Sequence, residues 1–170
     1  MFKKNNNLEY LVGNKEISNL SLPPFETLIC NFLGELSKEL DSNKNVKKYP
    51  DIKALAFWCR KQKILNYKKT FSTKEIRLGL GLIFHITPSN IPTNFAYSLI
   101  FGLLTGNSNI IKVPSKRFDQ VKIICTSINK ILKKKKYALV RKMISIVRYS
   151  SNNNYTKKFS SICNARLIWG

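Results

Sequence analysis

Apolar residues recur at three- and four-residue steps over residues 23–41, which indicates a helix with one buried face. A second helix is expected over residues 50–65. Each stretch opens on a proline, which suits the first helical turn because its missing N–H would have no partner there. A short extended stretch is expected at residues 8–12. The pattern therefore predicts an N-terminal helical segment over residues 1–77.

From residue 79 onward, short apolar runs alternate with helical stretches. Apolar runs without polar alternation are typical of strands that are buried on both faces. Strands are expected at residues 81–87, 109–113, 143–147 and 165–169, and helices at 91–105, 119–132 and 157–163. This alternation predicts an α/β fold in three layers, with a parallel sheet between helices.

Ligands of such sheets gather at the carboxyl ends of the strands. Four polar or glycine-containing segments follow the expected strands: residues 88–90, residues 114–116, the loop at Tyr149, and Gly170. Because the carboxyl ends of parallel strands meet at one edge of a sheet, we expect these segments to line a common rim.

The chain is strongly basic, with 30 Lys and Arg against 9 Asp and Glu and a net charge of +21. Nucleic acid, an anionic membrane surface and anionic small ligands all fit this charge. Lysine is spread along the chain together with Asn and Ile, as an AT-rich codon bias would produce. The one block, Lys133–Lys136, ends an expected helix, where cations suit the helix dipole. No nucleic-acid motif accompanies it, so a basic nucleic-acid-binding module is only an alternative.

Several classes of protein are excluded by what the sequence lacks. No apolar stretch approaches the ~20 residues of a membrane-spanning helix, so no membrane span is expected. The four cysteines form no CxxC pair, and His85 is the single histidine, so no metal site is expected. His85 lies in an apolar run and is interpreted as a packed histidine. We expect a cytoplasmic protein with four reduced, inert cysteines: Cys30, Cys59, Cys125 and Cys163.

The segment from Leu78 to Lys116 carries a specific resemblance. It contains Pro88-Ser89-Asn90-Ile91-Pro92, then Gly106-Asn107, then a strand that ends at Lys112 before Pro114-Ser115. In this order the elements resemble the nucleotide-binding region of the aldehyde dehydrogenase superfamily. Within it they are most similar to the acyl-CoA reductase family, which includes the fatty-acid reductase component of bacterial bioluminescence. The resemblance implies that residues 78–170 form part of a Rossmann-like nucleotide-binding domain of the aldehyde dehydrogenase type, incomplete and preceded by the helical segment.

Enzymes of this family reduce an acyl thioester, carried by CoA or by a protein, to a fatty aldehyde with NADPH. The resemblance gives Asn90 the role of oxyanion stabiliser. The residue type agrees, since an amide N–H₂ aimed at a carbonyl oxygen is worth about 3–4 kcal/mol in such a site. The alternative for Asn90 is an ordinary turn asparagine that bonds to nearby backbone.

The resemblance assigns Lys112 to the adenosine ribose of the cofactor. Many NAD-preferring relatives have an acidic residue three places later, where this chain has Ser115, followed by Lys116 and Arg117. Two cations and no carboxylate favour a 2′-phosphate, so we expect NADPH rather than NADH. The other expected cofactor contacts are Thr87, Pro88, Ser89, Pro114 and Gly170, while Gly106-Asn107 is interpreted as a structural turn.

In this superfamily a cysteine beyond the position of Gly170 accepts the acyl group, and none of the four cysteines here matches it. The general base and the oligomerisation segment lie beyond that position too. We therefore expect an N-terminal fragment that is inactive alone; the full-length family implies an acyl-transfer or synthetase partner and a homo-oligomer. A non-catalytic remnant is the other alternative. The helices at 23–41 and 50–65 are expected to leave apolar patches exposed.

Overall fold

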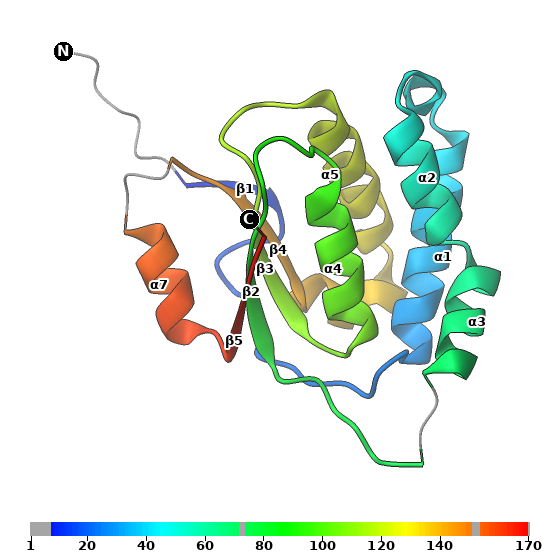
Figure 1. Ribbon diagram of the computed structural model, residues 1–170, viewed down its shortest axis with the longest axis horizontal. Helices are drawn as coiled ribbons and strands as arrows, with labels where there is room; N and C mark the ends of the chain where they lie inside the picture. The colour runs from blue at the N-terminus through cyan, green and yellow to red at the C-terminus, as the bar shows by residue number, and fades with distance from the viewer. Residues whose placement is uncertain (1–7, 72–73, 151–153, 170) are drawn as a thin grey trace.

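The computed structural model describes residues 8–71, 74–150 and 154–169, and its centre is a five-stranded sheet within those ranges. The strand order is β1-β4-β3-β2-β5 (Figure 1). The strands are β1 (Glu9–Val12), β2 (Leu82–Ile86), β3 (Ser108–Lys112), β4 (Ile144–Arg148) and β5 (Ala165–Ile168). Strands β2 to β5 are parallel to their neighbours, whereas β1 runs antiparallel to β4.

Helices cover both faces of the sheet, and a further layer of helices lies outside one of these faces (Figure 1). Helices α4 and α5 pack on one face, α1, α2 and α3 lie outside them, and α7 covers the other face. The helices are α1 (Thr27–Ser42), α2 (Pro50–Trp58), α3 (Lys61–Thr70), α4 (Asn94–Leu104), α5 (Asp119–Leu132), α6 (Ala138–Lys142) and α7 (Tyr155–Ile162), with 3₁₀ turns at Lys44–Lys48 and Lys135–Tyr137. The expected Rossmann-like α/β fold is confirmed.

The sheet is mixed rather than wholly parallel, because the stretch expected at residues 8–12 joins it as an antiparallel edge strand. Glu9 pairs with Arg148 in that ladder. A crossover helix fixes the direction of the strands that it connects, and β1 is followed by the outer-layer helix α1 instead. The alternating pattern therefore determined the direction of β2 to β5 and left that of β1 open.

The helical segment differs from expectation in two places. The helix expected over residues 50–65 is two helices, α2 and α3, because Arg60 between them has an extended backbone (φ −57°, ψ 132°). The first helix begins at Thr27 rather than at residue 23, since Phe25 adopts a left-handed conformation (φ 55°) that a helix cannot include. Such a conformation is rare for a bulky residue.

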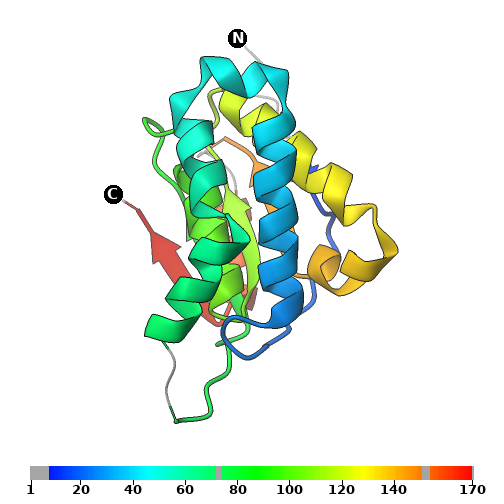
Figure 2. The ribbon, with the colours of Figure 1, turned by 90° about the vertical axis from the view of Figure 1, so that its right-hand side faces the viewer.

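Helix α1 is buried, which corrects the expectation that it would leave an exposed apolar patch. Its side chains at Ile29, Phe32, Leu33, Leu36 and Leu40 are fully or almost fully buried. Figure 2 shows α1 in the outer layer beside α2 and α3, and it also packs on α5. The main core cluster combines residues of these helices with residues of α4, α5, β3 and β4. In the second helical stretch Phe57 of α2 is 47% exposed, and further large apolar side chains are exposed after α3.

Candidate functional site

The carboxyl ends of β2 and β3 are tied together at the edge where the sequence places the cofactor. The carbonyl oxygen of Lys112 accepts two hydrogen bonds from Thr87: from its hydroxyl at 2.9 Å and from its N–H at 3.3 Å. Thr87 is buried, so its hydroxyl serves the link between the strands. The structure thus brings the two expected cofactor segments side by side through their backbones.

The turn that contains Asn90 lies between β2 and α4. Ser89 and Asn90 are exposed and Pro88 is half-buried. Within the described residues, the Asn90 side chain has no hydrogen-bond partner in the protein, so its amide is available to an external acceptor. Asn94, one turn further along, has a buried side-chain oxygen that is also without a partner there.

Lys112 points to the other face of the sheet. Its Nζ lies 5.3 Å from the centre of the Tyr149 ring, and that ring packs against Phe159 of α7. Burial lowers the pKa of Lys112 below its usual value. No ion pair is found for Lys112 in the described part of the chain. The side chain of Lys112 is therefore on the α7 face, while the Asn90 turn leads toward α4 on the opposite face.

The residues that follow β3 are held by β4. The carbonyl oxygen of Pro114 accepts a hydrogen bond from Arg148 Nε at 3.2 Å. The Ser115 hydroxyl donates to the carbonyl oxygen of Tyr149 at 3.0 Å, so its proton is directed into the protein. These contacts give both residues a structural role in shaping the edge.

The two cations after Ser115 differ in their partners. Lys116 Nζ stands 5.3 Å from the centre of the Phe118 ring. Arg117 pairs with Glu9 at 3.3 Å, and Glu9 also pairs with Arg148 at 3.1 Å. Lys116 thus joins Lys112 as a cation for which no carboxylate is found in the described ranges. Gly170 lies outside them.

His85 is part of a buried polar chain that the sequence did not reveal. Its Nε2–H donates to Asn109 Oδ1 at 2.9 Å, and its Nδ1 accepts from the Ser98 hydroxyl at 2.7 Å. Ser98 Oγ in turn accepts from the indole N–H of Trp169 at 3.0 Å. These partners assign the neutral tautomer with hydrogen on Nε2. Burial lowers the pKa of His85 to about 4, against a weaker opposing effect of Asn109.

The expectation of a packed histidine is therefore confirmed. This series of hydrogen bonds runs from the end of β5 through α4 and β2 to β3, and so connects the end of β5 to the middle of the sheet. The available signal was the presence of Ser98 and Asn109 at positions where their neighbours are apolar.

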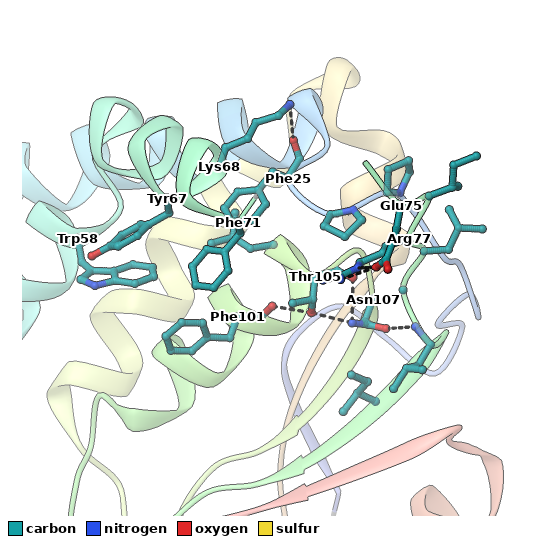
Figure 3. Close-up of a pocket in the computed structure, with 18 residues that line it drawn as sticks. Phe25, Trp58, Tyr67, Lys68, Phe71, Glu75, Arg77, Phe101, Thr105 and Asn107 are labelled. Carbon is teal, nitrogen blue, oxygen red and sulfur yellow. Dashed lines mark hydrogen bonds and ion pairs between the residues drawn. The ribbon is translucent and has the colours of Figure 1, made fainter. Parts of the chain in front are cut away.

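A large apolar cavity opens at the opposite edge, near the amino end of β2 (Figure 3). Its volume is about 880 Å³. Aromatic side chains from four segments dominate its wall: Phe25, Trp58, Tyr67, Phe71 and Phe101. A second cavity of about 530 Å³ lies beside α7. Neither is lined by Asn90 or Lys112.

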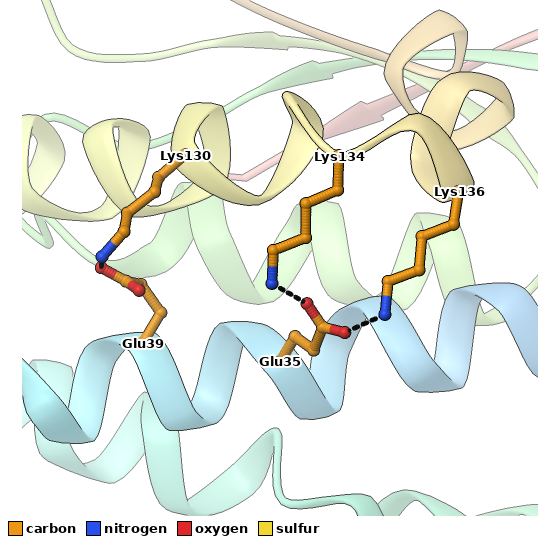
Figure 4. Close-up of polar contacts among 5 residues, drawn as sticks. All are labelled: Glu35, Glu39, Lys130, Lys134 and Lys136. Atoms are coloured by element: carbon orange, nitrogen blue, oxygen red, sulfur yellow. Dashed lines mark hydrogen bonds and ion pairs between the residues drawn. The ribbon is translucent and has the colours of Figure 1, made fainter.

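Two of the four lysines in the basic run after α5 are engaged within the protein (Figure 4). Glu35 of α1 binds Lys134 at 2.6 Å and also Lys136, and Glu39 binds Lys130 at 2.8 Å. The lysines lower the pKa of Glu35 to about 2, chiefly through the hydrogen bond from Lys134. A run in which half of the cations are bound to α1 gives less support to nucleic-acid binding than its sequence suggests.

The cysteines have the properties of packed thiols. Cys30, Cys59 and Cys125 are buried, and Cys163 is half-buried. Burial raises the pKa of Cys59 and of Cys125 to about 12. Because the thiolate is the nucleophile, such thiols are unreactive near neutral pH.

No helix in the described ranges is long and apolar enough to cross a membrane.

A search of curated proteins and a search of solved structures each found no match. A family model described as acyl-CoA reductase (LuxC) matches residues 59–170, which include β2 to β5, the Asn90 turn and the Lys112 strand end. This match covers well over half of the chain. The chain therefore belongs to the LuxC-type acyl-CoA reductase family.

Proposed function

We propose that this chain supplies the NADPH-binding part of a reductase that converts a fatty acyl thioester to a fatty aldehyde. The observation that carries the proposal is the family match over the Asn90 turn and the Lys112 strand end, which follow neighbouring parallel strands. Ligands of such sheets bind beyond the carboxyl ends of the strands. The link from Thr87 to Lys112 keeps the two ends in register.

The charges at this edge fit a phosphorylated nucleotide. Lys112 and Lys116 have aromatic neighbours and no carboxylate partner in the described residues, so their positive charges are not neutralised there. In this proposal Lys112 holds the adenosine ribose, Lys116 favours the 2′-phosphate, and Pro88 and Ser89 border the cofactor from β2. NADPH, when bound, supplies a hydride.

Asn90 is proposed to act on the thioester. Its exposed amide has no partner within the described protein and can donate to the carbonyl oxygen of the substrate. A donor that stabilises the developing oxyanion contributes about 3 kcal/mol.

The acyl-accepting cysteine in this proposal is none of the four described, because three are buried and Cys163 follows α7 in the nucleotide-binding part. We therefore propose that the chain alone does not complete the reaction. A thioester-supplying partner and self-association belong to the same proposal for the complete enzyme.

Titration with NADPH and NADH tests the cofactor proposal. We expect saturable binding that is tighter for NADPH and that Lys112→Ala weakens about tenfold, a loss of about 1.4 kcal/mol. Lys133→Ala is the matched control, since it removes one exposed cation at the far end of α5 and should leave binding unchanged. Isothermal calorimetry at fixed ionic strength measures both. Folded protein that binds neither nucleotide, or equal losses in the two variants, would contradict the proposal.

A further inference from the structure

We propose that the cavity at the amino edge of the sheet binds the hydrocarbon chain of the acyl substrate. This inference rests on the proposed function, because it takes a fatty acyl thioester as the substrate. It adds a site formed by residues 23–25, 58–71, 75–80 and the end of α4, which lies outside the cofactor edge.

The wall of the cavity is built around Trp58. Its ring stacks on Tyr67, with the centroids 5.0 Å apart, and meets Phe101 edge to face at 5.2 Å. These three rings come from α2, α3 and α4, so the packing of the helices forms the cavity. A volume of about 880 Å³ lies within the roughly 300–1,000 Å³ that small-molecule sites have.

Phe25 completes the wall in a strained conformation. Its left-handed backbone is uncommon for a bulky residue and costs about 1 kcal/mol or more. The conformation is held by a hydrogen bond from its N–H to Leu104 and by one from Lys68 to its carbonyl oxygen at 3.3 Å. The ring of Phe25 then lies parallel to that of Phe71, 6.3 Å away.

Apolar side chains at the mouth are unusually exposed. Phe71, Ile76, Leu78 and Leu80 are all more than half exposed, and all four line the cavity. Single exposed apolar residues are ordinary, but a contiguous group around one cavity marks a binding surface. Burial of this surface by a ligand is a favourable contribution to binding.

The polar groups of the lining indicate what the ligand lacks. Arg77 pairs with Glu75 at 2.6 Å, Lys68 bonds to Phe25, and the amide of Asn107 bonds to Thr105 and to the N–H of Leu80. Apart from the Tyr67 hydroxyl and the Trp58 indole N–H, the polar side chains of the lining have partners in the described protein. A peptide segment would bring backbone N–H and C=O groups that need partners when buried. A hydrocarbon chain brings none and needs only the apolar surface that dominates the wall.

Helix α4 connects the cavity to the Asn90 turn. Phe101 and Tyr97 lie four residues apart on one helix face, and both rings contact Trp58. Asn94 lies one turn closer to Asn90. Helix α4 has 11 residues and spans about 16 Å at about 1.5 Å per residue. The cavity includes Phe101 but not Tyr97, so an acyl chain with its end in the cavity has to displace the Trp58 ring from Tyr97 for its thioester to reach Asn90.

Fluorescence of Trp58 tests the site directly. In the chain carrying Trp169→Phe, Trp58 is the single tryptophan, and it is titrated with saturated acyl-CoAs of 2 to 16 carbons below their micelle concentrations. We expect the dissociation constant to fall about three- to fourfold per added methylene until the cavity is filled. CoA and acetyl-CoA should leave the emission unchanged. A dissociation constant that is independent of chain length overturns the inference.

Phe101→Ala and Phe57→Ala form the matched pair of variants. The two phenylalanines are 46% and 47% exposed on helices, but only Phe101 lines the cavity. We expect Phe101→Ala to weaken binding of the longer chains about tenfold and Phe57→Ala to leave it unchanged. Leu78→Asp, at an exposed loop position, should act like Phe101→Ala without disturbing helix packing. Equal effects of Phe101→Ala and Phe57→Ala overturn the inference. NADPH is absent from these titrations, so a failure of the cofactor proposal would not alter their outcome.

Discussion

The two edges of the sheet differ in the groups that have no partner within the described protein: polar and charged groups at one edge, and apolar surface at the other. The carboxyl edge carries an exposed Asn90 amide and the cations Lys112 and Lys116, which have no carboxylate partner in the described ranges. Toward the amino edge, Lys134 and Lys136 are paired with Glu35, and the unsatisfied surface is the apolar cavity. The conspicuous lysine run is thus partly neutralised within the protein, although Lys133 and Lys135 of the same run have no ion pair in the described ranges.

This difference shows that the location of basic residues says less about anion binding than their partners do. The lysine run is the most conspicuous charge feature in the sequence, yet two of its four cations, Lys134 and Lys136, bind Glu35 of α1. Lys112 is inconspicuous in the sequence, and it stands at a strand end without an ion pair in the described ranges. In our proposals the two edges bind different groups: phosphates and the thioester at the carboxyl edge, and a hydrocarbon chain at the amino edge.

Gly102 lets α4, the helix that runs between the two edges, pack closely on β3. A Cβ at this position would collide with the side-chain amide of Asn109, the residue that accepts from His85. We expect Gly102→Ala to lower the free energy of unfolding by about 3 kcal/mol or more, through overpacking and loss of the buried hydrogen bond. Urea unfolding followed by circular dichroism measures this change.

Gly34→Ala is the matched control for that change. Gly34 is also a helical glycine, but an added Cβ would meet Lys61 at an ordinary contact distance of 3.4 Å. Alanine there should be neutral or stabilise α1 by about 0.5–1 kcal/mol. If both variants lost the same stability, the close approach of α4 to β3 would not be what joins the edges.

His85 lies between the two edges, so its protonation tests the stability of the part of the sheet that connects them. Its pKa is about 4 in the folded chain against an ordinary 6.5, so between these values only the unfolded chain takes up the proton. The stability from neutral His85 is fully present above pH 6.5 and falls as the pH drops to 4, by about 3 kcal/mol at most. Urea midpoints at pH 7 and pH 5 measure the loss.

His85 is the only histidine, so few other groups titrate in that interval. His85→Gln removes the titration and should flatten the stability profile between pH 7 and pH 5, even if the variant is less stable at both. A wild-type profile that is already flat would mean that His85 is accessible to protons in the folded chain.

The spacing of apolar residues was sufficient to predict an element whose bounds depend on that element's own residues alone. Helix α5 was predicted at residues 119–132 and occupies them, because its apolar face is uninterrupted. The break between α2 and α3 was not predictable in this way, since apolar spacing continues across Cys59 while the backbone at Arg60 turns extended. The pairing of β1 with β4 joins residues 139 apart, and local spacing contains no information about such a partner.

The site shows the same division. The resemblance identified the turn and the strand end that meet at the carboxyl edge. It did not indicate that the hydroxyls of Thr87 and Ser115 donate to backbone carbonyl oxygens and are therefore engaged within the protein. The cavity depends on where the segment after α3 lies against α4, which residue types do not specify. Alternating apolar residues at Ile76, Leu78 and Leu80 were the one available signal.

The smallest expected effect concerns the paired lysines. Glu35→Gln should lower the free energy of unfolding at pH 7 by about 1 kcal/mol, since it removes two partly exposed ion pairs. The folded pKa of Glu35 is about 2 against 4.5, so this contribution is present above pH 4.5 and is lost as the pH falls toward 2. Denaturation at pH 7 and pH 3 tests it.

Glu39→Gln is the control on the same helix. It removes a single pair with Lys130, so about half the loss is expected. If Glu35→Gln cost no more than Glu39→Gln at pH 7, the lysine run would not be neutralised by α1, and the contrast between the edges would weaken.

The antiparallel strand β1 has a consequence for how the chain is made. Its partner Arg148 is translated 139 residues after Glu9. At about 5–20 residues per second, roughly 7–28 s pass on the ribosome before β1 can dock. During that time Leu11 and Val12, which end up in the core, have no sheet to join and are open to chaperones.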